Sequence, residues 1–350
     1  MKKMTEYRPV LVLVASLVLV TPMIWTNGAH LDTGMTIATV SLIAISAGLA
    51  YGEAGILTVA QAAFAAIGAY VTAISTTHFG WPTGLGLLAA IIIPACIAFP
   101  LALMIIRLSA LALALATVMI SSITYQLLSA GGEFTGGFIG IGGIAPLPFA
   151  GPLQTYLFAW VLVVIVVIAM IHLRHSTQGR ALRVIQSDSL LAQSLGIPVT
   201  RRLAAVFALS AAIAGLAGWL YAHTRGYLAP ESLPLNLSIS VLVMAIVGGK
   251  KSALGPVLGA TLLTLVFEFI PSAQAQGMFY GALLVFVLLF FPGGILGVNW
   301  SGVRWNQNLR NRLRRSAKPV HSGVVQDERP EARQQKLTQQ RGDSAHDFIR

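Results

Sequence analysis

Residues 154–173 read QTYLFAWVLVVIVVIAMIHL, a stretch of twenty residues that contains no Asp, Glu, Lys or Arg. An α-helix rises about 1.5 Å per residue, so a helix of this length crosses the apolar core of a bilayer, which is about 30 Å thick. Nine further apolar stretches can be drawn along the chain, at roughly 9–26, 36–54, 58–77, 84–106, 108–129, 203–223, 236–249, 254–270 and 277–298. The pattern predicts an all-α polytopic membrane protein with about ten transmembrane or partly re-entrant helices.

The composition excludes an ordinary soluble enzyme. Of the 350 residues, 56% are hydrophobic and 10% are charged, whereas soluble domains carry about 25% charged residues. The net charge is +11, and 11 of the 23 Lys and Arg residues lie in 301–350. Because the other basic residues gather in a few loops, they indicate membrane topology rather than nucleic-acid binding. The single cysteine, Cys96, lies in an apolar stretch and is expected to be inert.

The distribution of basic residues predicts that both termini are cytoplasmic. With the N-terminus inside, only Arg225 falls outside, together with the acidic residues Asp32, Glu133 and Glu231 in outer loops. The cytoplasmic side then receives Lys2, Lys3, Arg8, Arg107, Arg174, Arg180, Arg183, Arg201, Arg202, Lys250, Lys251 and the basic residues of the tail. The opposite orientation would place nearly all of these residues on the translocated side.

Two regions of different character follow from this pattern. Residues 1–305 hold all the apolar stretches and form a transmembrane domain, with a long cytoplasmic loop at about 174–202. Residues 306–350 are basic and polar without a hydrophobic period, so we expect a disordered cytoplasmic tail. The basic start of the tail is expected to lie against anionic lipid headgroups.

Two of the apolar stretches contain residues that favour a break in the helix. Gly52, Glu53 and Gly55 lie in the sequence YGEAG, and Gly248 and Gly249 end a stretch that is short for a full crossing. Non-helical backbone at membrane depth occurs only where protein or a water-filled cavity surrounds it. These five residues are therefore candidates for a translocation path. The alternative is that the glycines permit close packing of helices.

We predict no catalytic, cofactor or metal site. The chain has no GxSxG or HExxH motif, and VGGKKS at 247–252 lacks the earlier glycine of a phosphate loop. His172 and His175 lie three residues apart without an acid or Cys nearby to complete a metal set. Glu53 and Glu268 lie within or at the edge of apolar stretches, where carboxylates usually face a cavity or a partner. An ion-coupled secondary transporter that uses these two carboxylates is therefore an alternative function. For Glu53, a structural role at an interfacial turn is a further alternative.

The cytoplasmic loop 174–202 carries a helical apolar pattern that is not needed to span a membrane. The pattern follows Arg180 and Arg183, and Gly196 and Pro198 end the helix. A helix laid into the groove of a partner protein is a recurrent use of such a pattern. A helix that lies on its own membrane is the alternative.

The loop sequence GRALRVIQSDSLLAQSLGIPVTRR, residues 179–202, resembles the coupling loop of permease subunits of ATP-binding-cassette importers. More narrowly, it is similar to the branched-chain amino acid permease family of LivM type. Three further segments resemble this family in the same order: GILTVAQAAFAAIGAYVTA (55–73), FTGGFIGIGGI (134–144) and GWLYAHTRGYLAPESLPLNLSISVLVMAIVGGKKSALGPVLGA (218–260). The resemblance extends over about 36–297. It implies a non-enzymatic permease subunit in a bacterial inner membrane, for branched-chain amino acids or a related small organic solute.

The resemblance also implies partners. They are a second related permease, two cytosolic ATPases that bind the ATP, and a periplasmic or extracellular solute-binding protein. A helix from about Ala181 to Leu195 would dock into an ATPase groove. The residues implied in this coupling are Arg180, Arg183, Asp188, Leu191, Leu195, Gly196 and Ile197. The chain departs from the family at Ser187, Ser189 and Gln193, where acidic residues are usual, and at the adjacent Lys250 and Lys251.

Overall fold

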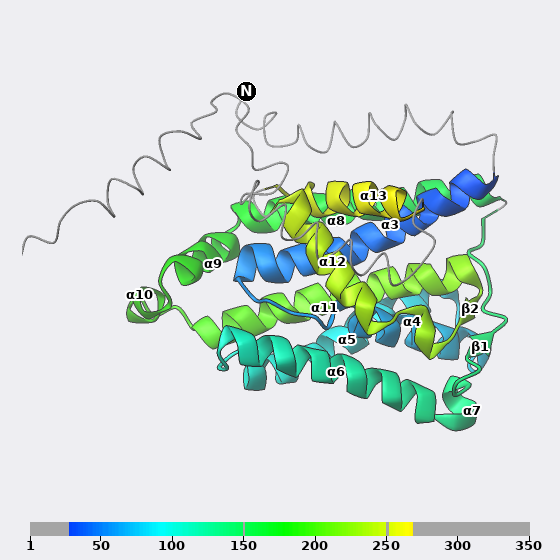
Figure 1. The fold of residues 1–350 in the computed structure, drawn as a ribbon, viewed down its shortest axis with the longest axis horizontal. Helices are drawn as coiled ribbons and strands as arrows, with labels where there is room; N and C mark the ends of the chain where they lie inside the picture. Colours follow the sequence, from blue (N-terminus) through cyan, green and yellow to red (C-terminus); the bar gives the residue numbers. More distant parts are fainter. Residues whose placement is uncertain (1–27, 150, 250–251, 269–350) are drawn as a thin grey trace, which may run out of the picture. The chain divides into compact units, whose positions relative to one another are not determined.

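The computed structural model describes residues 28–149, 151–249 and 252–268 (Figure 1). The elements in chain order are α3 (Gly28–Gly48), the π-helical turn η1 (Leu49–Glu53), α4 (Gln61–Thr77), α5 (Thr83–Ile105), α6 (Ala110–Ala130), α7 (Gly132–Thr135), β1 (Ile141–Gly142), α8 (Pro152–His175), α9 (Thr177–Ser187), α10 (Ser189–Ser194), α11 (Val199–Arg225), β2 (Tyr227–Leu228), η2 (Pro230–Ser232), α12 (Leu235–Gly248) and α13 (Gly255–Glu268). The predicted stretches 9–26 and 277–298, the tail and both termini lie outside the described residues.

The described part is all-helical apart from one short β-ladder. Each of the eight apolar stretches predicted there coincides with a helix. Six helical segments are long and apolar enough to cross a membrane: His30–Glu53, Thr83–Ile105, Ala110–Ala130, Pro152–His175, Val199–Arg225 and Pro230–Gly248. The ladder pairs β1 with β2 in antiparallel register, with Ile141 opposite Leu228. Because α3 begins at Gly28, the prediction that Asp32 lies in a loop is wrong.

Helix α11 lies at the centre of the helix packing. It contacts α4 and α5 along much of its length and α3 elsewhere, while α3 also packs against α8, α12 and α13. Of the residues in the most apolar stretch of α11, 72% are buried, compared with 22% in α5 and 17% in α6. The outer faces of α5 and α6 expose large apolar side chains such as Met104 of α5 and Met119 of α6, as helices in contact with lipid or another membrane protein do.

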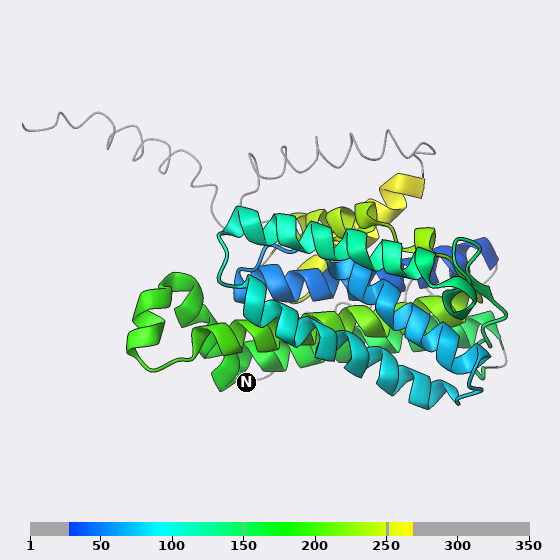
Figure 2. The same ribbon diagram turned by 90° about the horizontal axis from the view of Figure 1, so that it is seen from below.

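Figures 1 and 2 show α9 and α10 beyond the end of the bundle where α8 stops and α11 begins. Short α7 and the β-ladder lie at the opposite end (Figure 1). We call α9 and α10 together the loop helices. The described helices therefore have one end next to the loop helices and an opposite end next to the β-ladder, which we call the β-ladder end.

The contacts of α11 with its neighbours depend on glycine. A Cβ atom at Gly68 of α4 would lie 2.5 Å from the Cα of Gly215 of α11, and one at Gly218 would lie 2.7 Å from the backbone nitrogen of Ala69. Lipid gives no hydrophobic force between helices, so association relies on such close packing of backbones.

We predict that Gly218→Val lowers the thermal unfolding midpoint of the detergent-purified chain by several degrees. The added side chain would collide with the backbone of α4, and overpacking of this kind costs about 1–3 kcal/mol or more. Gly84→Val in α5 is the matched control, because a Cβ there meets no atom within 4 Å. Equal shifts of the midpoint in the two variants would contradict the proposed packing constraint.

Candidate functional site

The break predicted in the first described membrane segment is present. The π-helical turn η1 ends at Glu53, Gly55 adopts a φ of +70°, and α4 begins only at Gln61. The left-handed φ suits glycine because it has no Cβ. Residues 55–60 therefore form a non-helical link between two apolar helices, and π-helical turns are often found at functional sites.

The backbone of this link is held by side-chain hydroxyls from other helices. The N–H of Val59 donates to Oγ1 of Thr117 at 3.1 Å, and Oγ of Ser121 donates to the carbonyl of Val59 at 2.9 Å. At the start of α4, the N–H of Ala62 donates to Oγ of Ser238 at 2.9 Å. Helices α6 and α12 thus supply the partners that the helix break removes, as irregular backbone at membrane depth requires.

A buried polar cluster, formed by Ser46, Gln61 and Ser210, lies next to the break. Oγ of Ser46 donates to Oε1 of Gln61 at 2.9 Å, Nε2 of Gln61 donates to Oγ of Ser210 at 3.0 Å, and Oγ of Ser210 lies 2.8 Å from the carbonyl of Ser46. All three residues are at most 1% exposed. The cluster joins α3, α4 and α11 through uncharged groups that satisfy one another. The cluster was not predicted from the sequence, although a Gln in an apolar stretch is a signal for such a cluster.

A cavity of about 370 Å³ lies beside the break, between α4, α6 and the start of α12. Its lining includes the polar side chains of Ser122, Tyr125 and Asn236, together with the small residues Ala63 and Ala66. The lining contains no charged residue, so the cavity suits a small solute without net charge. No group of three His, Cys, Asp or Glu side chains that could hold a metal occurs in the described part.

The loop segment contains two helices rather than one. The prediction of a continuous helix from Ala181 to Leu195 is wrong, because the chain is extended at Asp188, with a φ of −158°. Oδ1 of Asp188 accepts hydrogen bonds from the N–H groups of Leu190 and Leu191 at 2.9 and 3.1 Å, and so caps the start of α10. The predicted stop is confirmed: α10 ends at Ser194, and Gly196 adopts a φ of +75° just beyond the C-cap residue Leu195.

The apolar side chains of the loop helices face two ways. Leu182, Ile185 and Ala192 are buried, whereas Leu190, Leu191 and Leu195 are 75%, 50% and 65% exposed. Ile197 is half-buried beside Gly196, and both residues line a shallow cavity at the start of α11. The three exposed leucines form an apolar surface on and next to α10, which we call the leucine surface.

Two of the predicted coupling residues have partners within the chain. Nη1 of Arg180 donates to the carbonyl of His175 at 3.0 Å, and Nη1 of Arg183 donates to the carbonyl of Arg174 at 2.8 Å. Both carbonyls belong to the last turn of α8. The two guanidinium groups therefore cap α8, where positive charge also complements the helix dipole.

The end of α8 and the loop helix α9 are each joined to the helix break by one polar contact. Nε of Arg174 lies 2.5 Å from Oε1 of Glu53, with the two side chains 14% and 9% exposed. Nε2 of Gln186 in α9 donates to the carbonyl of Gly52 at 2.9 Å. The end of α8 and α9 thus hold the last turn of η1. The ion pair of Glu53 agrees with the structural role considered for this residue.

The other predicted glycines, Gly248 and Gly249, lie at the end of α12 and close to the start of α13. Gly249 adopts a φ of +105°, and a Cβ at Gly248 would lie 3.0 Å from the Cα of Gly255. A Cβ at Gly48 would lie 2.5 Å from Cγ of Pro256. This geometry matches the close-packing alternative. The side chain of Glu268 and residues Lys250 and Lys251 lie outside the described part of the structure.

We predict that Glu53 and Arg174 are energetically coupled. Glu53→Ala or Arg174→Ala alone leaves a mostly buried charge without its partner, at a cost of about 3 kcal/mol. The double variant should then be less destabilised than the sum of the single variants. Denaturant unfolding of the purified chain measures the three values. The exposed pair Asp32 and Arg225 is the control, for which we expect a coupling of at most about 1 kcal/mol. Additive effects at Glu53 and Arg174 would contradict the coupling.

Comparison with known proteins identifies relatives for most of the chain. The family model described as "Branched-chain amino acid transport system / permease component" matches residues 31–288. The chain is 30% identical over 294 residues to the high-affinity branched-chain amino acid transport system permease protein LivM of Salmonella typhimurium, and likewise to LivM of Escherichia coli. Each alignment covers 74% of this chain and 69% of the relative. The permease protein LivH of Salmonella typhimurium is 33% identical over 143 residues, which is 39% of this chain and 46% of LivH. No solved structure is significantly similar to the chain.

Proposed function

Because this chain belongs to the family of permease components of branched-chain amino acid transport systems, we propose that its loop helices receive the motion of a cytosolic ATPase and pass it to the helix break. The chain is a multi-pass membrane permease of an ATP-binding-cassette transport system, without catalytic activity of its own. The proposed assembly contains a second related permease, two ATPases on the cytoplasmic side and a solute-binding protein on the opposite side. In this arrangement both termini and the loop helices are cytoplasmic, in a bacterial inner membrane.

The leucine surface supports the docking role of the loop helices. Leu190, Leu191 and Leu195 point away from the packed helices, although Leu182 and Ile185 of the same segment are buried. Apolar side chains at this density on a short helix outside the bundle suit the groove of a partner. Asp188 caps α10 and Gly196 closes it, so both residues hold the leucines in one orientation.

The proposed function rests on two contacts with η1, one from α9 and one from the end of α8. They connect the docking surface to the membrane segment. A displacement of α9 acts directly on Gly52 through Gln186, and a displacement of the end of α8 acts on Glu53 through Arg174. Packed elements shift as bodies rather than deform continuously, so such a displacement reaches the link 55–60 and α4. Gly52, Glu53 and Gly55 are therefore assigned to the moving part of the translocation path.

The cavity beside the break is the proposed section of the path within this subunit. Hydroxyl, phenol and amide groups line it without a full charge, which fits a zwitterionic amino acid or another neutral organic solute. Gly248 and Gly249 support the path indirectly, by allowing α12 and α13 to pack closely. The ion-coupled alternative gains nothing from Glu53, since its carboxylate is paired with Arg174.

We predict that Leu191→Asp combined with Leu195→Asp abolishes co-purification of the ATPases with the tagged chain. Burying these carboxylates in an apolar groove is strongly unfavourable, so the complex should dissociate in detergent. Mass spectrometry of the purified sample gives the readout. Ser187→Asp is the matched control, because it adds a charge at an exposed position of the same loop without removing an apolar side chain. Retention of the ATPases by the double variant, with normal membrane insertion, would overturn the docking role.

We further predict that Gln186→Ala uncouples transport from the ATPases. The variant loses the hydrogen bond to Gly52 but keeps the leucine surface, so the ATPases should still co-purify while solute uptake in proteoliposomes falls several-fold. Gln178→Ala changes another exposed glutamine of α9 and serves as the control. The same uptake in both variants would show that the contact with Gly52 transmits nothing.

A further inference from the structure

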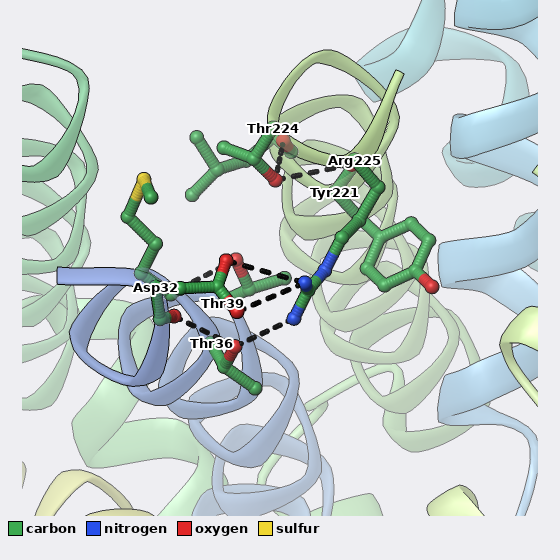
Figure 3. A network of polar contacts seen from close by, with 8 residues as sticks. Asp32, Thr36, Thr39, Tyr221, Thr224 and Arg225 are labelled. Atoms are coloured by element: carbon green, nitrogen blue, oxygen red, sulfur yellow. Dashed lines mark hydrogen bonds and ion pairs between the residues drawn. The ribbon is translucent and has the colours of Figure 1, made fainter. Parts of the chain in front are cut away.

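A second polar site lies at the β-ladder end, where α3 begins and α11 ends. Nη1 of Arg225 donates to both carboxylate oxygens of Asp32 at 3.2 and 3.1 Å, and Nη2 donates to Oγ1 of Thr36 at 2.8 Å. Figure 3 shows Asp32 and Thr36 on α3 pointing toward Arg225. The sequence predicts Asp32 and Arg225 on the outer side but does not predict their pairing, since they lie 193 positions apart.

The ion pair contributes little to the stability of the fold, and both of its groups can still bind a ligand. Side chains of Asp32 and Arg225 are 54% and 38% exposed, and exposed ion pairs contribute at most about 1 kcal/mol to stability. A guanidinium has five N–H donors and a carboxylate has about four acceptor positions. Each group can therefore bind a further partner while the pair stays formed.

The pair borders a cavity of about 180 Å³ with a polar and an apolar part. Thr39 and Thr224 line the polar part with Asp32 and Arg225, and Ile43 and Leu237 belong to the apolar part. A ligand that matches this lining has opposite charges at one end and a hydrocarbon group at the other.

The two threonines present acceptors to the cavity. Oγ1 of Thr39 donates to the carbonyl of Met35 at 2.9 Å, and Oγ1 of Thr224 donates to the carbonyl of Leu220 at 2.9 Å. Each hydroxyl hydrogen is thus used within its own helix, and the oxygen lone pairs remain. Lone pairs next to the Asp32 carboxylate favour an ammonium group over a second carboxylate.

We propose that this cavity binds a zwitterionic α-amino acid with an aliphatic side chain, as an entry site of the transport path. The inference rests on the proposed function and assigns the solute its first contacts in this subunit. The solute carboxylate accepts hydrogen bonds from Arg225, its ammonium donates to Asp32 and Thr39, and its side chain contacts Ile43. A molecule with only one of the two charges leaves one member of the pair without a counterpart, so it binds more weakly.

The test is leucine binding to the full chain in lipid nanodiscs, measured by isothermal titration calorimetry. We expect 4-methylpentanoate, which lacks the ammonium, and 3-methylbutylamine, which lacks the carboxylate, to bind about tenfold or more weakly than leucine. Arg225→Gln and Asp32→Asn should each weaken leucine binding by a similar factor. Glu133→Gln, at an exposed carboxylate of α7, should leave it unchanged.

Co-purification of the ATPases with the same variants separates the two proposals. If the ATPases co-purify but leucine binding is absent, or is the same in Arg225→Gln and Asp32→Asn as in the original chain, the entry site is wrong and the proposed function stands. If the ATPases do not co-purify with the original chain, the proposed function fails, and the leucine titrations still decide the entry site. Equal binding of leucine and the two analogues would also overturn the zwitterion site.

Discussion

The structure depends on one requirement: every backbone N–H and C=O inside the bilayer needs a partner from the protein. The chain stops being helical after Glu53 and becomes helical again at Gln61, so the residues between them lose their own helical partners. Thr117, Ser121 and Ser238 replace these partners with side-chain hydroxyls. The same bonds fix α6 and α12 against the start of α4. The cavity with its partly polar lining forms where these three helices meet, so the helix break and the candidate path have a common cause.

Close packing of α4 against α11 favours the movement of these helices as one body. Gly68, Gly215 and Gly218 allow the backbones of α4 and α11 to approach so closely that a methyl group would collide. Contacts of this kind resist gradual deformation and instead transmit displacement. The loop helix α9 is attached to this unit at Gly52, and the end of α8, from which α9 continues, is attached at Glu53. In the proposed function, a protein that docks on the leucine surface therefore acts on the segment that leads into the break.

Features that depend on local composition could be predicted from the sequence. Apolar length predicted the membrane helices, and the glycines around Glu53 predicted the break, because both signals lie within one segment. The division of the loop into α9 and α10 was missed, since Ser-Asp-Ser is compatible with a helix interior as well as with a cap. The hydroxyl partners of Val59 and the pairing of Asp32 with Arg225 were also missed. They join residues 58 to 193 positions apart, and only the packing of the helices brings them together.

The cluster of Ser46, Gln61 and Ser210 has an electrical consequence. These residues join α3, α4 and α11 at the break through groups that carry no net charge. A transmembrane voltage does work on a charge that moves, about 2.3 kcal/mol per elementary charge per 100 mV, but does none on a neutral group apart from its small dipole. The one buried ion pair described nearby, Glu53 with Arg174, also sums to zero and would move as a unit. In the proposed function, the helix break therefore changes shape without gating charge, so the membrane potential does little work on this motion.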